Sequence, residues 1–369
     1  MLTERIPPYR RRAVFEAADC GDPVLPNTMR AARLHEAGKP LRIDEVTVPR
    51  PSAPGEVLVR IQGSGFCHSD VHLIAGEVPI ARLPMTLGHE NAGTVAAVAE
   101  GVRNFKEGDR VVIYGGWGDG VCDSCVAGDE NICDNLAWPG VFGGDGGYAE
   151  YLLVPRERYL IKLDKLEPKV AAPYTDAALT PYHAIYRALD VLTPDRAALV
   201  IGTGGLGQFA VKILRLICGA EVIAADVADD KLATARSIGA HHVVNSRDKD
   251  ALERVLALSR GGVAATFDFV GIDSTLALAF GATRKQGRVV QVGLGGGTAK
   301  LQVMTSWKPE VAYSYSWWGN IKELREVIAL AEDGRLPPVP LEFEPLDRIG
   351  EAYERVKGGK AKGRIVITP

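Results

Sequence analysis

The chain has 369 residues, of which 46% are hydrophobic and 24% are charged, and its net charge is −3 at pH 7. A chain of this length is large for one hydrophobic core, so we expect two domains. The small net charge gives no reason to expect nucleic acid or an anionic membrane as a partner, and no apolar run is long enough to span a bilayer.

Residues 1–28 show no regular pattern, and we expect them to form a peripheral extension. The run "YRRR" at residues 9–12 is basic, but no apolar stretch follows it as in a secretory signal. The acidic residues Glu4, Glu16 and Asp19 argue against a transit peptide. The default expectation is a cytoplasmic protein, in which clustered cysteines serve metals or catalysis more often than disulfides.

Short β-rich segments follow from residue 29 to about residue 110. The runs "EVLVRIQG", "AGTVAAV" and "GDRVVIY" have the composition of strands and are bounded by proline and glycine. Strands at this spacing predict a small β barrel or sandwich, which we expect to occupy residues 29–178.

The pattern changes near residue 179, where strands and helices begin to alternate. "AALVIG" is typical of a buried strand, "LGQFAVKILRLICGA" has apolar residues at helical spacing, and "EVIAAD" is strand-like again. The alternation continues to residue 312 and predicts a doubly wound parallel sheet. We expect residues 313–369, which contain an amphipathic helix and the strand "GRIVITP", to return to the first domain.

The stretch "VIGTGGLG" matches G-x-G-x-x-G between a predicted strand and a predicted helix, the context in which this motif binds a dinucleotide. The first glycine permits a tight turn, the second lets the pyrophosphate approach the backbone, and the third lets the helix pack on the strand. The phosphates would lie at the helix N-terminus. The alternative is an ordinary glycine-rich turn. The candidate contacts at this turn are Gly202, Gly204, Gly205, Leu206 and Gly207.

Asp226 ends the next predicted strand, where an acidic residue can bond the ribose 2′-hydroxyl. A carboxylate there would repel a 2′-phosphate, which favours NAD over NADP, although an ordinary strand-end Asp is the alternative. Two further predicted strands end at "FDFVG" and "VVQVGL", and open sheets bind ligands at the carboxyl ends of their strands. The candidate nicotinamide contacts are Val270, Val292, Gly293 and Leu294.

Two other stretches, "GFCHSDVHL" and "LGHENAG", bring cysteine, histidine and carboxylate side chains close together in sequence. Each such residue alone is more often a core or surface group than a metal ligand, but zinc takes all three side-chain types. The residues concerned are Cys67, His68, Ser69, Asp70, His72, His89 and Glu90.

The stretch "GDGVCDSCVAGDENIC" holds Cys122, Cys125 and Cys133, half of the six cysteines of the chain. The C-x-x-C pair could be a redox pair, or the three thiolates could be three of the four ligands of a zinc site. Redox pairs usually lie at a helix N-terminus after a strand, whereas glycines and acidic residues surround these cysteines, so the zinc site is favoured.

With these motifs in this order, residues 29–369 resemble the zinc-dependent medium-chain alcohol dehydrogenases. The resemblance is closest to bacterial members that act on secondary alcohols and ketones, through "YGGWG" and "TDAALTPYHA". It implies an α/β protein with a GroES-like β-rich catalytic domain and a Rossmann domain. It also implies NAD, a catalytic and a structural zinc ion, and a homodimer or homotetramer.

The resemblance makes Cys67, His89 and Asp176 the ligands of the catalytic zinc, with Glu90 beside them as a group that can swing onto the metal. Many relatives carry cysteine at the position of Asp176, whose alternative role is a surface carboxylate before the next helix. Three protein ligands leave one position for the alcohol oxygen, as in catalytic zinc sites. Zinc lowers the pKa of the oxygen that it binds, which favours hydride transfer to the nicotinamide.

The resemblance also implies a path for the alcohol proton. Ser69 matches the hydroxyl that takes this proton, and His72 matches the histidine that passes it to solvent. Asp70 matches the carboxylate that orients His89 through its other ring nitrogen. His68 is expected beside the cofactor.

The structural zinc site of the family has four cysteines at the spacing C-x2-C-x2-C-x7-C. Its last three positions fall on Cys122, Cys125 and Cys133, and the first falls on Asp119, where this sequence departs from the pattern. A carboxylate oxygen is an acceptable zinc ligand. Two alternatives remain. One is a site that has lost its metal, and the other is a redox pair.

The activity that the resemblance implies is reversible hydride transfer between an alcohol and NAD. Trp117, in "YGGWG", is expected to line the alcohol pocket and favours a secondary or modest apolar primary alcohol over a sugar. One alternative is a polyol, threonine or hydroxyacyl-thioester dehydrogenase of the same superfamily. Another is a non-catalytic binding protein that keeps the fold without the metal.

Overall fold

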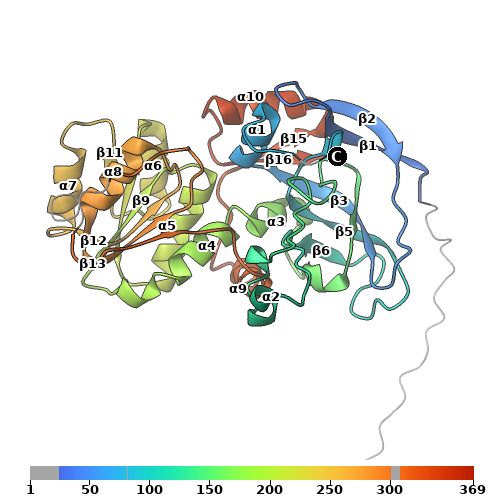
Figure 1. Cartoon of the computed structure of the whole chain (residues 1–369), viewed down its shortest axis with the longest axis horizontal. Helices are drawn as coiled ribbons and strands as arrows, with labels where there is room; N and C mark the ends of the chain where they lie inside the picture. The colour runs from blue at the N-terminus through green and yellow to red at the C-terminus, as the bar shows by residue number, and fades with distance from the viewer. Residues whose placement is uncertain (1–24, 81, 301–307) are drawn as a thin grey trace, which may run out of the picture.

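The structure is a computed structural model that describes residues 25–80, 82–300 and 308–369, so most of the predicted extension lies outside the described residues. Two bodies lie side by side (Figure 1). One is built on a mostly antiparallel sheet that joins residues 57–66 to the last strands of the chain, and the other on a parallel sheet with helices packed against it. The predicted fold class is confirmed.

The first body is organised around β3 (Val57–Phe66), which pairs with β5 (Glu90–Val98) on one side and with β16 (Arg364–Thr368) on the other. In the middle of β3 the exposed Arg60 and the buried Ile61 lie on opposite faces, as the two-residue period of a strand requires. The sheet is completed by β6 (Arg110–Ile113), β7 (Tyr151–Val154), β8 (Leu160–Lys162) and β15 (Leu341–Pro345), and a smaller sheet holds β1 (Thr28–Leu34), β2 (Arg42–Thr47) and β4 (Met85–Thr86).

The second body has six parallel strands in the order β11-β10-β9-β12-β13-β14. All residues of the central β9 (Ala197–Ile201) are buried because helices cover both of its faces. Its side chains alternate between two separate hydrophobic clusters, one that includes Val200 and α5 (Gly205–Ile217) and one that includes Leu199 and α7 (Ala251–Leu258). The remaining elements are β10 (Glu221–Asp226), α6 (Asp229–Ser237), β11 (His242–Asn245), β12 (Val263–Asp268), α8 (Asp273–Ala282), β13 (Thr283–Gln291) and β14 (Ala312–Tyr315).

The strand order reverses between β9, β10 and β12, which opens the usual ligand crevice at their carboxyl ends. After β14 the chain passes through α9 (Ile321–Glu332), which packs on α4 (Leu179–Tyr186), and α10 (Ile349–Lys357) before β16 pairs with β3. The boundary predicted after residue 312 falls inside β14, because this strand still pairs with β13. We therefore propose that the return begins after Tyr315.

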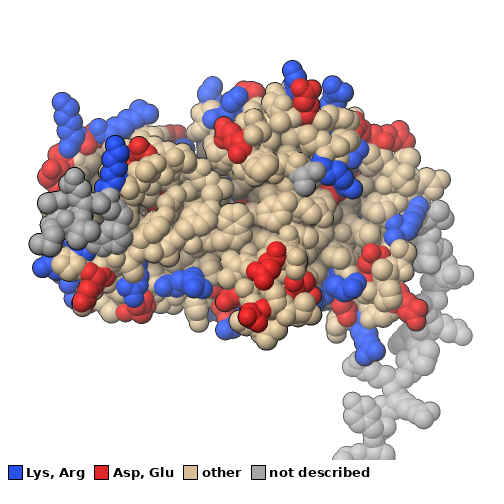
Figure 2. All heavy atoms as spheres, viewed as in Figure 1, with Lys and Arg blue, Asp and Glu red and all other residues tan. Residues whose placement is uncertain are grey.

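Charges of both signs are interspersed over the face shown in Figure 2, and a broad area across its middle carries few of them. Among the described residues no helix is both long enough and apolar enough to cross a bilayer.

Candidate active site

Four buried side chains predicted to lie at the catalytic metal meet between the two bodies: Cys67, His89, Glu90 and Asp176 offer ligand atoms within 4.8 Å of one another. Asp176 Oδ2 lies 3.5 Å from Cys67 Sγ and 3.6 Å from His89 Nε2. Ligands about 2.0–2.3 Å from a zinc ion at the corners of a tetrahedron are about 3.3–3.8 Å apart. The spacing of these three side chains therefore fits one zinc ion.

Turns at the ends of strands bring these side chains together. Cys67 follows β3 as the N-cap of α1 (His68–Ala75), and Asp70 at the third helical position accepts a 2.8 Å hydrogen bond from the Cys67 N–H. Gly88 precedes His89 with a φ of +97°, a conformation that favours glycine, and a Cβ there would lie 2.6 Å from the Tyr148 ring. Asp176 follows the short helix η3 (Ala172–Thr175).

The orientation of His89 is set from one side by a carboxylate. Its Nδ1 lies 3.5 Å from Asp70 Oδ1, while Asp70 Oδ2 accepts a 2.8 Å hydrogen bond from the Tyr148 hydroxyl. Both ring nitrogens of His89 are buried and have no hydrogen-bond partner among the described residues. Burial opposes a charge on His89, but Asp70 and Asp176 outweigh it and raise the pKa of His89 well above its usual value. The same negative field would attract a metal cation.

Arg364, at the start of β16, completes the cluster and was not predicted from the sequence. Its Nε donates to Glu90 Oε2 at 3.0 Å, and its Nη2 contacts Glu90 Oε1 and lies 3.4 Å from Asp176 Oδ2. Burial raises the pKa of Asp176, but His89 and Arg364 together hold it below its usual value. The only sign in the sequence that Arg364 belongs to a buried site was its place as a charged residue at the start of the apolar run "RIVIT".

The residues of the predicted proton path lie on α1. Ser69 Oγ is 3.4 Å from Cys67 Sγ, so its hydroxyl borders the cluster. His72 bonds the Glu77 carboxylate through Nδ1, a partner that the sequence did not predict. The exposed ring of His68 lies 5.1 Å from that of His72.

An aromatic wall covers the cluster on another side. The Trp138 ring contacts the His89 ring at 5.2 Å and stacks on Trp318 at 4.4 Å, with Phe142 and Trp317 each 5.7 Å away. The buried indole nitrogen of Trp138 has no hydrogen-bond partner among the described residues. The sequence did not single out this residue, because "AWPG" carries no chemical signal.

Trp117, predicted to line the alcohol pocket, has its contacts near the cysteine lobe. Its indole N–H donates to the Tyr114 carbonyl at 2.8 Å, and its ring packs against Tyr159 at 6.2 Å. It lines a surface pocket of about 560 Å³ together with Asp119. The turn "YGGWG" thus directs Trp117 toward the cysteine lobe, and the indole that contacts the catalytic cluster is that of Trp138.

The glycine-rich turn has the geometry that a dinucleotide needs. Gly202 has a φ of +85°, and a Cβ at Gly207 would lie 1.8 Å from the Gly202 carbonyl oxygen, so close helix packing requires glycine at that position. A Cβ at Gly204 would meet nothing within 4 Å, which leaves its backbone open to a ligand. Gly205, followed by Leu206, begins α5, and Arg364 Nη1 would lie 3.1 Å from a Cβ on Gly205. The turn therefore offers backbone amides and a positive charge to a pyrophosphate.

Asp226 ends β10, as predicted, and its carboxylate faces the same turn. Its Oδ2 accepts hydrogen bonds from the Thr203 N–H at 2.7 Å and the Thr203 hydroxyl at 3.0 Å, and its Oδ1 accepts one from Ala228. The candidate nicotinamide contacts lie at the carboxyl ends of the neighbouring strands β12 and β13: Val270, Val292, Gly293 and Leu294.

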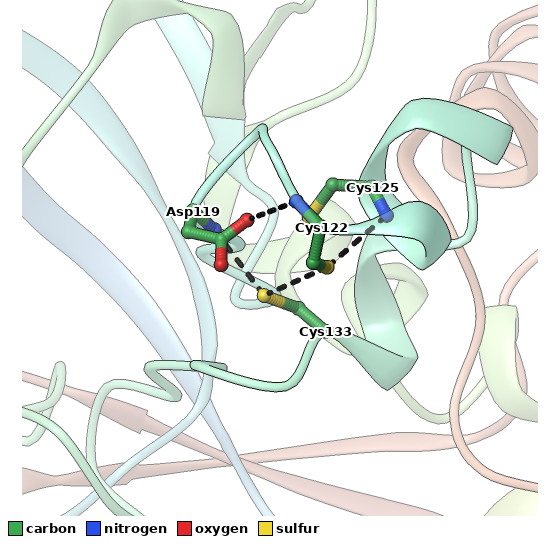
Figure 3. A group of neighbouring side chains, drawn as sticks. All are labelled: Asp119, Cys122, Cys125 and Cys133. Atoms are coloured by element: carbon green, nitrogen blue, oxygen red, sulfur yellow. Dashed lines mark hydrogen bonds between the residues drawn. The ribbon is translucent and has the colours of Figure 1, made fainter.

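The cysteine lobe forms a second cluster, in which Asp119, Cys122, Cys125 and Cys133 offer ligand atoms within 4.8 Å of one another. Figure 3 shows the Asp119 carboxylate and the thiols of Cys122 and Cys133 directed into the same space, and the two sulfur atoms are 3.7 Å apart. Hydrogen bonds from Asn135 and from the amides that follow Asp119 hold the pKa of Asp119 below its usual value. All three thiols are free, and this donor set fits a closed zinc site.

Two family models match the chain, the alcohol dehydrogenase GroES-like domain over residues 53–165 and the zinc-binding dehydrogenase over residues 205–333. The NAD-dependent alcohol dehydrogenase of Sulfurisphaera tokodaii is 36% identical over 351 residues, which cover 92% of this chain and 100% of that relative. The D-arabinose 1-dehydrogenase (NADP(+)) of Saccharolobus solfataricus is 34% identical, with 92% of this chain and 97% of the relative covered.

Among solved structures, the alcohol dehydrogenase from Aeropyrum pernix superimposes with a TM-score of 0.85 at 39% identity, over 92% of this chain and 100% of that one. The similarity extends to both bodies, because one family model matches residues of the antiparallel sheet and the other matches residues of the parallel sheet. The chain belongs to the zinc-type medium-chain alcohol dehydrogenase family.

Proposed function

We propose that Cys67, His89 and Asp176 hold the catalytic zinc of an NAD-dependent alcohol dehydrogenase, which transfers hydride between an alcohol and NAD in either direction. The observation that carries this proposal is the buried, unpartnered Nε2 of His89, which faces the Asp176 carboxylate 3.6 Å away. When bound, zinc supplies Lewis acidity to the substrate oxygen, and NAD accepts or returns the hydride.

The side chains around the cluster have separate tasks in this reaction. Ser69 takes the alcohol proton, and its place beside Cys67 supports this role. His72 receives the proton and releases it to solvent from Nε2, because its Nδ1 bonds Glu77. Asp70 keeps the His89 ring in position. Arg364 donates a hydrogen bond to Glu90 and keeps it beside the cluster, as a group that can approach the metal.

The cofactor lies over the glycine-rich turn in this proposal, with its pyrophosphate at the N-terminus of α5 beside Arg364 and with His68 nearby. Asp226 meets the adenosine ribose and disfavours the 2′-phosphate of NADP, a preference supported by the NAD-dependent relatives. Val270 and residues 292–294 contact the nicotinamide.

The substrate class is a secondary or modest apolar primary alcohol. The support is the aromatic wall of Trp138, Phe142 and Trp317 beside His89, which excludes water and offers few hydrogen-bonding groups to a sugar. A polyhydric alcohol is the second candidate, because a D-arabinose dehydrogenase is among the relatives. NADH formation with matched secondary, primary and polyhydric alcohols decides between them, and a clear preference for the polyhydric ones would reverse this assignment.

The second cluster holds a structural zinc ion through Asp119, Cys122, Cys125 and Cys133. The five described cysteines of the chain carry free thiols, which suits a reducing compartment, and we propose a cytoplasmic location.

We also propose a homodimer or homotetramer, with β14 at a contact between copies. Among the described strands β14 is one of the two edges of the parallel sheet, and all four of its residues are exposed. The uncharged Tyr313 and Tyr315 leave this edge without the charges that normally prevent pairing. A second copy can extend the sheet by adding its own β14 about a two-fold axis.

The ligand assignment is tested with the variants Cys67→Ser and Asp176→Ala. Each should lose well over nine-tenths of turnover and most of the catalytic metal, yet bind NAD with nearly unchanged affinity in a calorimetric titration, because the glycine-rich turn belongs to the other sheet. The matched control is the exposed carboxylate variant Asp195→Ala, which should behave as wild type. A variant that keeps more than about a tenth of the activity, a loss under ~1.4 kcal/mol, would show that its residue is not a metal ligand.

A further inference from the structure

The segment between β14 and α9 carries a backbone strain that the proposed function does not explain. Trp318 has a φ of +51°, in the left-handed region that a bulky side chain rarely adopts. Its side chain is buried and stacks between Trp138 and Tyr114. A Cβ on Gly115 would lie 2.5 Å from the Trp318 ring, so the turn after β6 leaves room for the indole. A strained backbone of this kind persists only where contacts with the surrounding structure hold the residue in that conformation.

Hydrogen bonds from the cysteine lobe hold this segment on both sides of Trp318. The buried Asn131 donates from Nδ2 to the Trp317 carbonyl at 2.8 Å, and Asn320 Nδ2 donates to Asp129 Oδ1 at 3.3 Å. The Tyr114 hydroxyl donates to the Gly319 carbonyl at 2.9 Å. Asp129 and Asn131 lie between Cys125 and Cys133 in sequence, so the fold of the lobe determines where they can reach.

Trp318 in turn contacts the catalytic cluster along two routes. Its indole N–H donates to the Thr175 carbonyl at 3.0 Å, directly before Asp176 in the chain. Its ring stacks at 4.4 Å on Trp138, whose other neighbour is the His89 ring at 5.2 Å. The Trp318 side chain thus contacts the residue before one proposed ligand and, through the Trp138 ring, the side chain of a second.

We propose that Asn131 and Trp318 are positioning residues that link the cysteine lobe to the catalytic cluster, so that closure of the lobe sets the placement of Asp176 and His89. The link rests on the proposed assignment of both metal sites. This link gives the cysteine lobe a role in addition to its own stability. If Asn131 were displaced, the strained segment would be released, and Thr175 and Trp138 could then move. The catalytic metal would then be held in altered geometry even though every one of its ligands is intact.

The test uses the full-length protein with Co²⁺ in place of zinc, because the visible absorption of Co²⁺ reports the geometry of its ligands. Wild type, Asn131→Ala and Trp318→Phe are each compared with a version that also carries Cys67→Ser, and the difference spectrum isolates the catalytic site. Release of the catalytic ion to a chelator and the separate kcat and KM values are measured on the same samples.

The link predicts a changed catalytic-site spectrum and about five- to tenfold faster release of the catalytic ion in either variant, as expected for loss of one buried hydrogen bond. The lobe should keep its ion, and kcat should fall while the KM for NAD stays unchanged. The double variant should be no worse than the more affected single variant, because both changes break the same link.

Two controls separate positioning from general stability. Thr266→Val removes a buried 2.8 Å hydrogen bond to Thr283 in the parallel sheet, and Val126→Ala changes an exposed residue of the lobe. Neither should alter the catalytic-site spectrum, even if Thr266→Val lowers the melting temperature as much as Asn131→Ala does. If Asn131→Ala does not fold, Asn131→Asp removes the same donor with little change in volume.

Catalytic-site spectra and release rates equal to wild type in Asn131→Ala and Trp318→Phe would overturn the link while leaving the metal assignment intact. Additive effects in the double variant would also overturn it. A wild-type protein that fails to bind two ions would overturn the metal assignment and the link together.

Discussion

His89 has two ring nitrogens with different neighbours, and the contrast explains how one residue can serve a metal site. Nε2 faces Cys67 and Asp176, whereas Nδ1 faces Asp70, whose other oxygen is held by the Tyr148 hydroxyl. A carboxylate behind a ligand histidine fixes the orientation of the ring and raises its basicity. Tyr148 is fully buried and stacks on Phe66, so its hydroxyl reaches Asp70 from a rigid position.

Tyr148→Phe should therefore weaken the catalytic site without changing any ligand. The ring and its packing remain, but Asp70 loses one of its two donors and can rotate away from His89. We expect about tenfold lower affinity for the catalytic zinc, a typical effect for a group behind a ligand, measured by competition with a chelator. The exposed Tyr186 provides the control Tyr186→Phe, and equal zinc affinity in both variants would contradict the role of Tyr148.

Asp226 has contacts that its motif did not reveal, since its carboxylate accepts hydrogen bonds from Thr203 in the glycine-rich turn. Asp226→Gly should both loosen this turn and remove the charge that repels a 2′-phosphate. We expect weaker NAD binding and a preference for NAD over NADP reduced about tenfold or more, measured as the ratio of kcat/KM values. Thr203→Val, which removes only the hydroxyl bond, is the control that should keep the NAD preference. Equal use of both cofactors by the wild-type protein would refute the argument from charge.

Among the elements, the cysteine lobe contributes little apolar surface to its own stability. Its short helix α2 (Asp123–Ala127) has no buried residue, and Val121, Val126 and Ile132 are exposed. Backbone amides donate hydrogen bonds to the cysteine sulfur atoms, as Asp119 N does to Cys133 Sγ at 3.3 Å, and these bonds fix where the thiols lie. Metal binding should therefore supply the free energy that closes this loop.

Asp119→Ala should loosen the lobe metal and lower the melting temperature by about 2–5 °C, while initial turnover falls less than it does in Asp176→Ala. Asp119→Cys should retain the metal, since it restores a fourth thiolate. Metal content after gel filtration and the melting curve provide the measurements. A lobe that keeps its ion equally well in Asp119→Ala would rule out Asp119 as a ligand.

At the scale of the whole molecule, the features that could be predicted from the sequence are those that a short segment contains by itself. The turns at residues 67–70, 89–90 and 202–207 each contain their own chemistry, and the apolar run of β9 is long enough to indicate a strand buried on both faces. Trp138, Tyr148 and Arg364 escaped prediction because they reach the cluster through packing of distant segments. The contacts of Trp117 with Tyr114 and Tyr159 could not be predicted for the same reason, since the direction of a side chain on a glycine-rich turn depends on its tertiary neighbours.

The open edge of the parallel sheet leads to a prediction about assembly. Ser316 donates its N–H to Gln291 in β13, so by the two-residue alternation the N–H of Tyr315 faces outward. Tyr315→Pro should remove this outward donor and shift the protein toward monomers, measured by analytical ultracentrifugation, with the pairing to β13 retained. Tyr315→Val keeps the N–H and should remain oligomeric. An unchanged sedimentation coefficient in Tyr315→Pro would place the contact between copies elsewhere.

The ion pair between Glu90 and Arg364 joins positions 274 residues apart, and the whole parallel sheet lies between them in the chain. During translation β3 and β5 therefore emerge roughly 15–55 s before β16 at usual rates of synthesis. For that interval the edge of β3 that later pairs with β16 stays open, and the Cys67 thiol and His89 lie on a nascent chain that lacks Arg364. The cluster that Arg364 shares with Glu90 and Asp176 thus becomes complete only after the whole parallel sheet has been synthesised.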